Sequence, residues 1–142
     1  MNVVLPAPDG RKNEVGYYQQ FRVGDIDVST FEQDHKTCAT LGFRFGKFAY
    51  SVDVADLNEK SLQALEGIET WVIDAGAYQK EAFSTHANLQ RIKKWSEHLK
   101  TKMTYLTVLT TYMDYKTLCD ELPPHIRPAY DGMVIDMETN WR

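Results

Sequence analysis

The sequence is short of cysteine, of positive charge and of long hydrophobic runs. Its two cysteines, Cys38 and Cys119, are far apart and form no Cys-x-x-Cys pair, so neither a zinc knuckle nor a disulfide framework is indicated, and we expect two reduced, partly buried thiols. A net charge of −4 argues against a broad basic surface for nucleic acid or anionic lipid. No run approaches the ~20 apolar residues of a membrane span, and the first residues lack the pattern of a signal peptide. We therefore expect a cytoplasmic protein that binds neither nucleic acid nor membrane.

The chain has enough apolar material for one domain. Of its 142 residues, 43% are apolar and 25% are charged, which is a globular composition. Residues 1–5 could form a short strand, but the segment from Pro6 to Asn13 consists of turn-forming residues. We therefore predict a loosely held N-terminal arm over residues 1–15 and a single domain over residues 16–142, with regular structure beginning at Gly16.

Two β-hairpins are predicted at the start of the domain. The dipeptides Gly24-Asp25 and Gly46-Lys47 each separate two runs that are rich in aromatic and β-branched residues, a pattern typical of tight hairpins. The four predicted strands cover residues 17–23, 26–32, 40–45 and 48–52. We expect these strands to be antiparallel.

After Asp53 the hydrophobic pattern alternates between helices and strands. Helices are predicted over residues 57–65, 87–100 and 115–122, and strands over 70–74, 103–109 and 133–137. The predicted fold class is α/β, a mixed β-sheet with antiparallel hairpins first and helices on one face. Right-handed crossovers between parallel strands would gather the loops after Asp53, Asp74 and Leu109 along one edge, where sites are usually built.

The aromatic residues and glycines indicate a core and turns rather than a recognition loop. Most of the large aromatic side chains are predicted to fill the core, namely Trp71, Trp95, Phe43, Phe45 and Phe48, whereas Tyr17, Tyr18, Tyr50 and Tyr78 are expected to be partly exposed. Asp74 ends a buried-strand run, and we expect it to accept backbone hydrogen bonds. The sequence contains no phosphate-cradling glycine loop and no Gly-x-Ser-x-Gly elbow.

Short segments occur in a characteristic order between Phe21 and Asp136. They are Phe31–His35, Leu41–Gly46, Tyr50–Asp53, Trp71–Asp74, Thr85–Leu89, Tyr105–Thr107, Asp114–Tyr115, Glu121–Pro124 and Tyr130–Gly132. In their order and spacing these segments resemble the C-terminal half of a metallo-β-lactamase-fold metal-dependent hydrolase. The nearest branch contains the phosphoribosyl cyclic phosphate phosphodiesterase of phosphonate breakdown.

This resemblance implies half of an αββα sandwich whose edge carries two zinc or manganese ions. His35 matches a metal ligand, Asp53 matches the carboxylate that bridges the metals, and His86 matches a histidine that orients or protonates the substrate phosphate. Val108 and Thr111 stand where the family pattern Leu-Thr-His-x-x-His-x-x-Asp-Tyr has histidines, and a valine has no lone pair for a metal. The His-x-His-x-Asp-His string of the family's first half is absent from the sequence.

The same residues also allow structural roles. His35 could be a loop histidine, Asp53 could turn or cap the chain before Leu57, and His86 could simply neighbour the N-terminus of the long helix. His98 matches no ligand position and is expected on the surface of that helix.

The leading functional prediction is a truncated or split metallo-β-lactamase-superfamily hydrolase of phosphodiesterase-like ancestry. Because its active site is degenerate, we expect it to be inactive alone and to bind no cofactor firmly, zinc or manganese being implied by the family only.

Two other accounts stay open. Half of a two-sheet sandwich would leave an apolar sheet face uncovered, which predicts a non-catalytic assembly module that homodimerises or pairs with a separately encoded N-terminal half. A third account is a mononuclear metal-binding protein that uses His35, Asp53 and a residue from a second copy.

Overall fold

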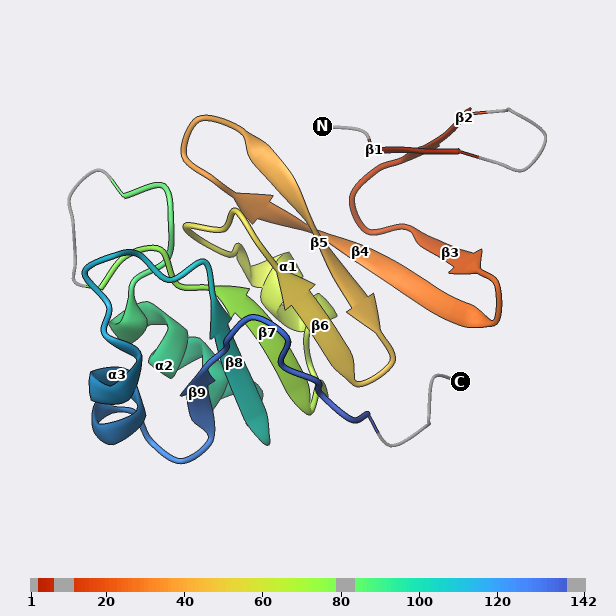
Figure 1. Ribbon diagram of the computed structural model, residues 1–142. Helices are drawn as coiled ribbons and strands as arrows, with labels where there is room; N and C mark the ends of the chain where they lie inside the picture. The colour runs from red at the N-terminus through yellow and green to blue at the C-terminus, as the bar shows by residue number, and fades with distance from the viewer. Residues whose placement is uncertain (1–2, 7–11, 79–83, 138–142) are drawn as a thin grey trace.

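The computed structural model describes residues 3–6, 12–78 and 84–137 (Figure 1). Strands lie at β1 (Val3–Pro6), β2 (Lys12–Val15), β3 (Gln20–Val23), β4 (Ile26–Asp34), β5 (Ala39–Phe45), β6 (Phe48–Ser51), β7 (Thr70–Asp74), β8 (Met103–Thr107) and β9 (Ile126–Pro128). Helices lie at α1 (Glu59–Ala64), α2 (Leu89–Leu99) and α3 (Tyr115–Glu121). Together they form a mixed α/β fold, as predicted.

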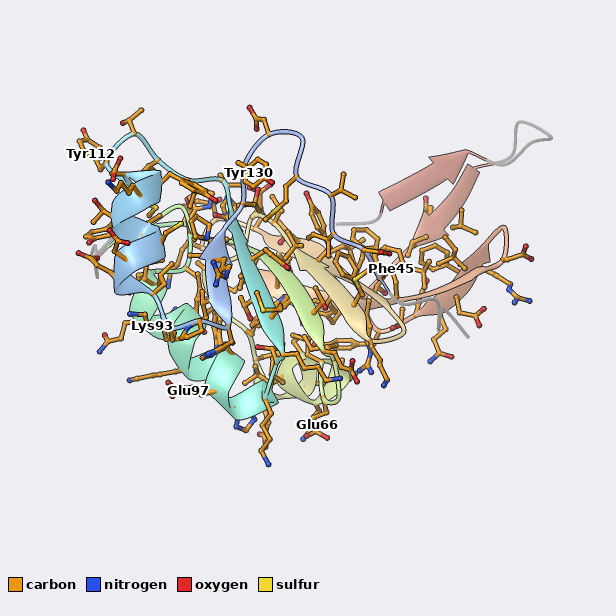
Figure 2. The ribbon with its side chains drawn as sticks, turned by 60° about the horizontal axis from the view of Figure 1, so that its bottom comes forward. Phe45, Glu66, Lys93, Glu97, Tyr112 and Tyr130 are labelled. Atoms are coloured by element: carbon orange, nitrogen blue, oxygen red, sulfur yellow. The ribbon has the colours of Figure 1, made fainter. Side chains whose placement is uncertain are left out.

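A seven-stranded mixed sheet in the order β3-β4-β5-β6-β7-β8-β9 forms the main body. Strands β3 to β6 pair antiparallel, and β6 to β9 pair parallel, so α1, α2 and α3 are each a crossover between neighbouring parallel strands. The predicted hairpin turns are confirmed, with Gly24 and Gly46 at φ values of +59° and +57° that suit glycine. The helices lie on one face of the sheet (Figures 1 and 2).

Each helix starts at a capping side chain. Asn58 accepts a hydrogen bond from the backbone N–H of Ser61, and Asn88 accepts one from Arg91. Asp114 caps α3 in the same way. Because α2 begins only at Leu89, His86 precedes the helix rather than belonging to its first turn.

The core lies between the sheet and the helices. On the strands it contains Ala49, Trp71, Ile73 and Leu106, and on the helices and their ends it contains Leu65, Ile92, Trp95, Leu99 and Leu118. Alternate residues of a strand point to opposite faces, which explains why Trp71 and Ile73 are fully buried while Val72 between them is only half-buried. The helical side of the sheet therefore holds the packed apolar interior.

The opposite side of the sheet, here called the second face, carries a different aromatic set. It consists of Phe43, Phe45, Phe48, Tyr50, Val72 and Tyr105, which are cross-strand partners in β5 to β8. The prediction that Phe43, Phe45 and Phe48 fill the core is wrong in this respect, because the alternation of the strands turns them away from the helices and leaves them half-buried. The segment after β9 runs across this side in Figure 1, and Figure 2 shows Tyr130 on the side away from Lys93, Glu97 and Glu66.

Three other predictions differ from the structure. The final strand predicted over residues 133–137 is wrong, since these residues form no strand. The last strand among the described residues is β9, a short edge strand of the parallel sheet that accommodates Pro128. The cysteines are both free and exposed rather than partly buried, Cys38 in a turn and Cys119 on α3. Regular structure begins before Gly16, because β1 and β2 pair as a separate hairpin.

The division into an arm over residues 1–15 and a domain over residues 16–142 stays a prediction. Among the residues that the structure describes, no helix is long and apolar enough to cross a membrane.

Candidate metal centre

The sequence-predicted site residues meet at the carboxyl ends of four strands. Strands β4, β6, β7 and β8 run in the same direction, because β4 and β6 are both antiparallel to β5 and the other two are parallel to β6. His35 follows β4, Asp53 follows β6, Asp74 ends β7 and Val108 follows β8. The loops that leave β6, β7 and β8 gather at the upper left of Figure 1. The predicted edge of the sheet therefore brings these residues close together.

Three side chains come together there with metal-binding atoms. His35, Asp53 and His86 each offer one ligand atom, and these atoms all lie within 4.8 Å of one another. The two histidines are partly buried and Asp53 is exposed, so the group opens to solvent at the carboxylate. Two imidazole nitrogens and one carboxylate oxygen are a ligand set that suits zinc and neighbouring transition metals.

His86 is oriented by a buried carboxylate. Its Nδ1 lies 2.5 Å from Oδ2 of Asp74, whose side chain is completely buried. In a neutral imidazole that donates from Nδ1 to this carboxylate, Nε2 keeps a free lone pair. Backbone contacts hold His86 as well, since its N–H donates to Oγ of Ser84 at 3.1 Å.

Asp74 forms hydrogen bonds with three segments at this edge of the sheet. Besides His86, its carboxylate accepts hydrogen bonds from the backbone N–H of Asp53 at 3.0 Å and of Gly76 at 2.8 Å. The backbone role expected for Asp74 is thus confirmed, and the contact with His86 is an additional one. A single buried side chain fixes both the loop after β6 and the histidine that precedes α2.

Gly76 is needed for the position of the His86 ring. A Cβ atom built on Gly76 would lie 2.6 Å from Cγ of His86 and 2.8 Å from its Cβ. Such distances are too short for real Cβ atoms, so any larger residue would displace the ring. Glycine at this position allows the loop after β7 to pack directly on the histidine.

His35 has an unusual ring environment. Its Nδ1 is buried and has no hydrogen-bond partner within residues 3–6, 12–78 and 84–137, whereas buried polar atoms normally have one. The ring packs edge-on against the ring of His86, with 5.0 Å between the centroids. A nitrogen of this kind is suited to accept a bond from an atom that the protein itself does not provide, such as a metal ion.

Asp53 occupies a left-handed backbone conformation, with a φ of 57°. Its N–H is held by Asp74, and its carbonyl accepts a hydrogen bond from Oγ1 of Thr40 at 2.8 Å. The helix cap after it is Asn58, so the alternative role of Asp53 as a cap is wrong. Among the described residues, none donates a hydrogen bond to its carboxylate, which is therefore available to a ligand.

Val108 also has a left-handed backbone, with a φ of 55° that is strained for a β-branched residue. Its side chain is 44% exposed, and Thr111 is exposed as well. The chain at Val108 therefore has the strained backbone of a site loop but a side chain that cannot coordinate a metal. His98 lies exposed on α2, as predicted.

Tyrosines connect the loops around this edge. The hydroxyl of Tyr78 donates a hydrogen bond to Oε2 of Glu121 at 2.7 Å, and this bond raises the pKa of Tyr78. Tyr115 packs edge-on against Tyr130 at 6.2 Å, and burial raises the pKa of Tyr115. The loop after β7 is thus attached to α3, and α3 to the segment after β9.

Sequence reasoning missed two members of the site. It placed Asp74 at the edge but not against His86, and it did not single out Gly76. The signal for both was the string Asp74-Ala-Gly76 at the end of a buried strand. Functional residues are common in loops at strand ends, and a glycine there allows another side chain to approach the backbone closely.

Comparisons with known proteins agree with this architecture. Residues 4–107 match a family model described as a beta-lactamase superfamily domain. A diphosphatase of the PhnP family has a similar structure, with a TM-score of 0.80 and 24% identity over 87% of this chain and 48% of that one. The metallo-β-lactamase-fold protein YhfI from Bacillus subtilis follows, with a TM-score of 0.65 and 14% identity over 84% of this chain and 53% of that one.

A curated relative is an octanoyltransferase of Porphyromonas gingivalis (strain ATCC BAA-308 / W83). It is 26% identical over 117 residues, which are 80% of this chain and 23% of that protein. The chain thus spans about half the length of the two solved structures and less than a quarter of this relative. The family model covers most of the sequence, and the fold agrees with it: the chain belongs to the beta-lactamase superfamily and has a metallo-β-lactamase-type α/β architecture.

Proposed function

We propose that this chain supplies the C-terminal half of a metal-dependent hydrolase of the phosphodiesterase type and that it does not turn over phosphodiesters by itself. The observation that carries the proposal is the meeting of His35, Asp53 and His86 at the carboxyl edge of the sheet. The resemblance to family motifs gives these residues roles in metal and phosphate binding, and the structural neighbours include a diphosphatase.

The residues present fit a metal ion but do not form a dinuclear site. The unpartnered Nδ1 of His35 and the free carboxylate of Asp53 are suitable donors. Two cations ~3.5–4 Å apart, as in dinuclear hydrolases, need more ligands than these. Val108 adds none, so on this proposal further ligands come from beyond the described residues, such as a separately encoded N-terminal half.

The chain's own residues would prepare the substrate side of such a site. The hydrogen bond from Nδ1 to Asp74 fixes the orientation of the His86 ring and leaves its other nitrogen, Nε2, for a ligand. The exposed carboxylate of Asp53 leaves the site open to an incoming substrate. When bound, metal ions in such sites polarise phosphoryl oxygens and activate water.

A turnover assay tests the proposal. The purified 142-residue chain, supplied with zinc or manganese, is incubated with bis-p-nitrophenyl phosphate, and the expected rate equals that of the metal salt alone. Added in trans, a polypeptide that carries the His-x-His-x-Asp-His half is expected to raise the rate, and His35→Ala to abolish that gain. Chelator-sensitive turnover by the chain alone, lost in Asp53→Asn, would contradict the account of an inactive half.

A non-catalytic assembly role is the second candidate function. It is favoured by the second face, where Tyr50 is 43% exposed beside half-buried Phe43, Phe48 and Val72. Aromatic and aliphatic side chains gathered on a sheet face are typical of surfaces that pack against another sheet. On this account the second face binds a second copy of the chain or a separately encoded N-terminal half.

Sedimentation equilibrium of the purified chain tests this role. We expect a homodimer that dissociates in Tyr50→Glu, because the substitution buries a charge in the contact. Tyr112→Glu is the matched control, since Tyr112 is 89% exposed in the loop after β8 and makes the same change of charge. A monomer at high protein concentration, with no binding to an N-terminal half, would argue against the assembly role.

A further inference from the structure

We propose that this chain by itself binds one divalent transition-metal ion through His35, Asp53 and Nε2 of His86, with His86 as a metal ligand rather than as a phosphate-orienting histidine. The proposal goes beyond the hydrolase function, because it requires neither a second metal nor residues from another chain. It assigns the ion to the class that prefers imidazole, zinc or cobalt, over magnesium and calcium.

The arrangement around His86 is that of a metal-bound histidine. Histidines that bind metals usually donate their other ring N–H to a carboxylate or carbonyl, which fixes the ring and makes the free nitrogen a better ligand. Asp74 provides this carboxylate at 2.5 Å, from a side chain that is completely buried. Gly76 allows the ring to sit close to the loop, so the orientation of His86 is determined from two sides.

The position of His86 relative to the other two ligands supports the same role. One ligand atom from each of His35, Asp53 and His86 lies within 4.8 Å of the others. A tetrahedral zinc ion with bonds of ~2.0–2.1 Å separates its ligand atoms by about 3.4 Å. Small side-chain movements would therefore bring all three atoms onto one ion, and the fourth position would be left to water.

The buried Nδ1 of His35 is an independent sign of a missing bond. Among the described residues no group forms a hydrogen bond with it, so the nitrogen is buried without a partner to replace water. The neighbouring ring of His86, 5.0 Å away, offers no such partner in this T-shaped contact. A cation shared by the two histidines would explain why both rings are held at this distance from each other.

Loss of the ligand at Val108 makes the role of His86 specific to this chain. In the family pattern a histidine occupies that position, and His86 is left for the substrate. Here Val108 has no donor atom, and in the part of the chain that the structure describes His86 is the residue that joins His35 and Asp53 in one group of possible ligands. The three residues give the His₂-carboxylate set of mononuclear zinc sites.

Isothermal titration of the chelator-treated 142-residue chain with ZnCl₂ tests the proposal directly. We expect one ion per chain, an affinity at least about 100-fold weaker in His86→Gln, and an unchanged affinity in His98→Gln, which alters an exposed histidine of α2. Asp74→Asn, a change to the positioning residue, is expected to weaken binding by ~10–100-fold while keeping the stoichiometry. Circular dichroism of the metal-free variants checks that each one folds.

A spectroscopic readout separates a ligand from a residue that is merely close. In ¹⁵N-labelled protein, zinc should shift the Nε2 resonance of His86 and leave Nδ1 protonated towards Asp74. With cobalt, the visible absorption of the bound ion should decrease in His86→Gln and not in His98→Gln. The proposal is overturned if the wild-type chain binds no zinc, or if His86→Gln binds it as tightly as the wild type while His35→Ala does not.

These outcomes are independent of the proposed hydrolase function. The titration contains no substrate and no second chain, so a lack of turnover does not affect its interpretation. Conversely, a chain that fails to bind zinc alone could still supply residues to a site completed by another half. Failure of the one proposal is therefore distinguishable from failure of the other.

Discussion

The two edges of the parallel strands use their polar side chains in different ways. At the edge where the strands begin, Glu69 pairs with Lys47 at 2.6 Å and with Lys102 at 2.8 Å, and each of these residues precedes a strand. Nearby, the guanidinium of Arg44 donates to the backbone carbonyls of Gly46, Ala64 and Glu66. These charged side chains are therefore paired with one another or with backbone carbonyls in the β5–β6 turn and around the end of α1.

The edge where the strands end retains free lone pairs. His35 has a buried unpartnered nitrogen, and the carboxylate of Asp53 is open to solvent. Asp53 and Val108 both have left-handed backbones, which other interactions have to maintain. Unpaired polar atoms and local strain that a fold does not need are expected at functional sites. The two edges therefore differ in that one pairs the charges named above, whereas the other leaves polar atoms of His35 and Asp53 without a partner among the described residues.

Among the substitutions at the two edges, replacement of Asp74 is expected to have the largest effect on stability. In Asp74→Ala the N–H groups of Asp53 and Gly76 and the ring of His86 lose a buried acceptor, so we expect a loss of about 3 kcal/mol of folding free energy. Urea unfolding followed by circular dichroism measures the change. Asp120→Ala, at an exposed position of α3, should stay within about 0.5 kcal/mol of the wild type. Equal effects of the two substitutions would show that Asp74 has no special structural role.

Replacement of Arg44 tests the opposite edge. Arg44→Met keeps most of the side-chain stem but removes the hydrogen bonds to three backbone carbonyls, and we expect a loss of about 2 kcal/mol. The control is Arg22→Met, because Arg22 forms an exposed ion pair with Asp27 whose loss should cost less than about 0.5 kcal/mol. Zinc affinity should not change in either variant. A large effect on zinc binding would mean that the two edges are not independent.

Relief of strain at Val108 should stabilise the chain. Glycine adopts a φ of 55° without a Cβ clash, so Val108→Gly is expected to raise the free energy of unfolding by about 1 kcal/mol. Val134→Gly serves as the control, since Val134 is 87% exposed and has no left-handed backbone, and it should not stabilise. The thermal midpoint of each variant gives the comparison. Destabilisation by Val108→Gly would show that its side chain contributes more by packing than its backbone costs in strain.

The smallest expected effect concerns the pH dependence of Glu69. Hydrogen bonds from Lys102 and then Lys47 hold the pKa of Glu69 below its ordinary value of 4.5. A carboxylate with a lowered pKa in the folded state stabilises the fold above its ordinary pKa, and this contribution is lost as the pH falls through the lowered value. Glu69→Gln should therefore reduce the acid-induced loss of stability slightly, whereas Glu97→Gln on α2 should leave it unchanged. Parallel melting curves from pH 6 to pH 3 for all three proteins would reveal any difference.

Much of the fold was predictable from local patterns. The strand Thr70–Asp74 was predicted with its observed bounds, and the helix predicted over residues 57–65 contains α1. Both predictions rest on patterns within a few neighbouring residues. Strand β9 was missed, since three residues with a proline carry no periodic pattern. The faces of Phe43 and Phe48 were also missed, because hydrophobicity does not tell on which side of a sheet a half-buried residue lies.

For the candidate site, too, some features were predictable from the sequence and others only from the structure. The sequence alone indicated that His35 and Asp53 are candidate metal ligands, that His86 is a candidate for orienting or protonating a phosphate, and that Val108 cannot bind a metal. These predictions rest on side-chain chemistry and on the order of motifs. Only the tertiary structure decided that Asp74 binds His86, that Gly76 makes room for the ring, and that Nδ1 of His35 is left without a partner. The physical reason is that burial and hydrogen-bond partners arise between strands distant in sequence, when their carboxyl ends meet at one edge.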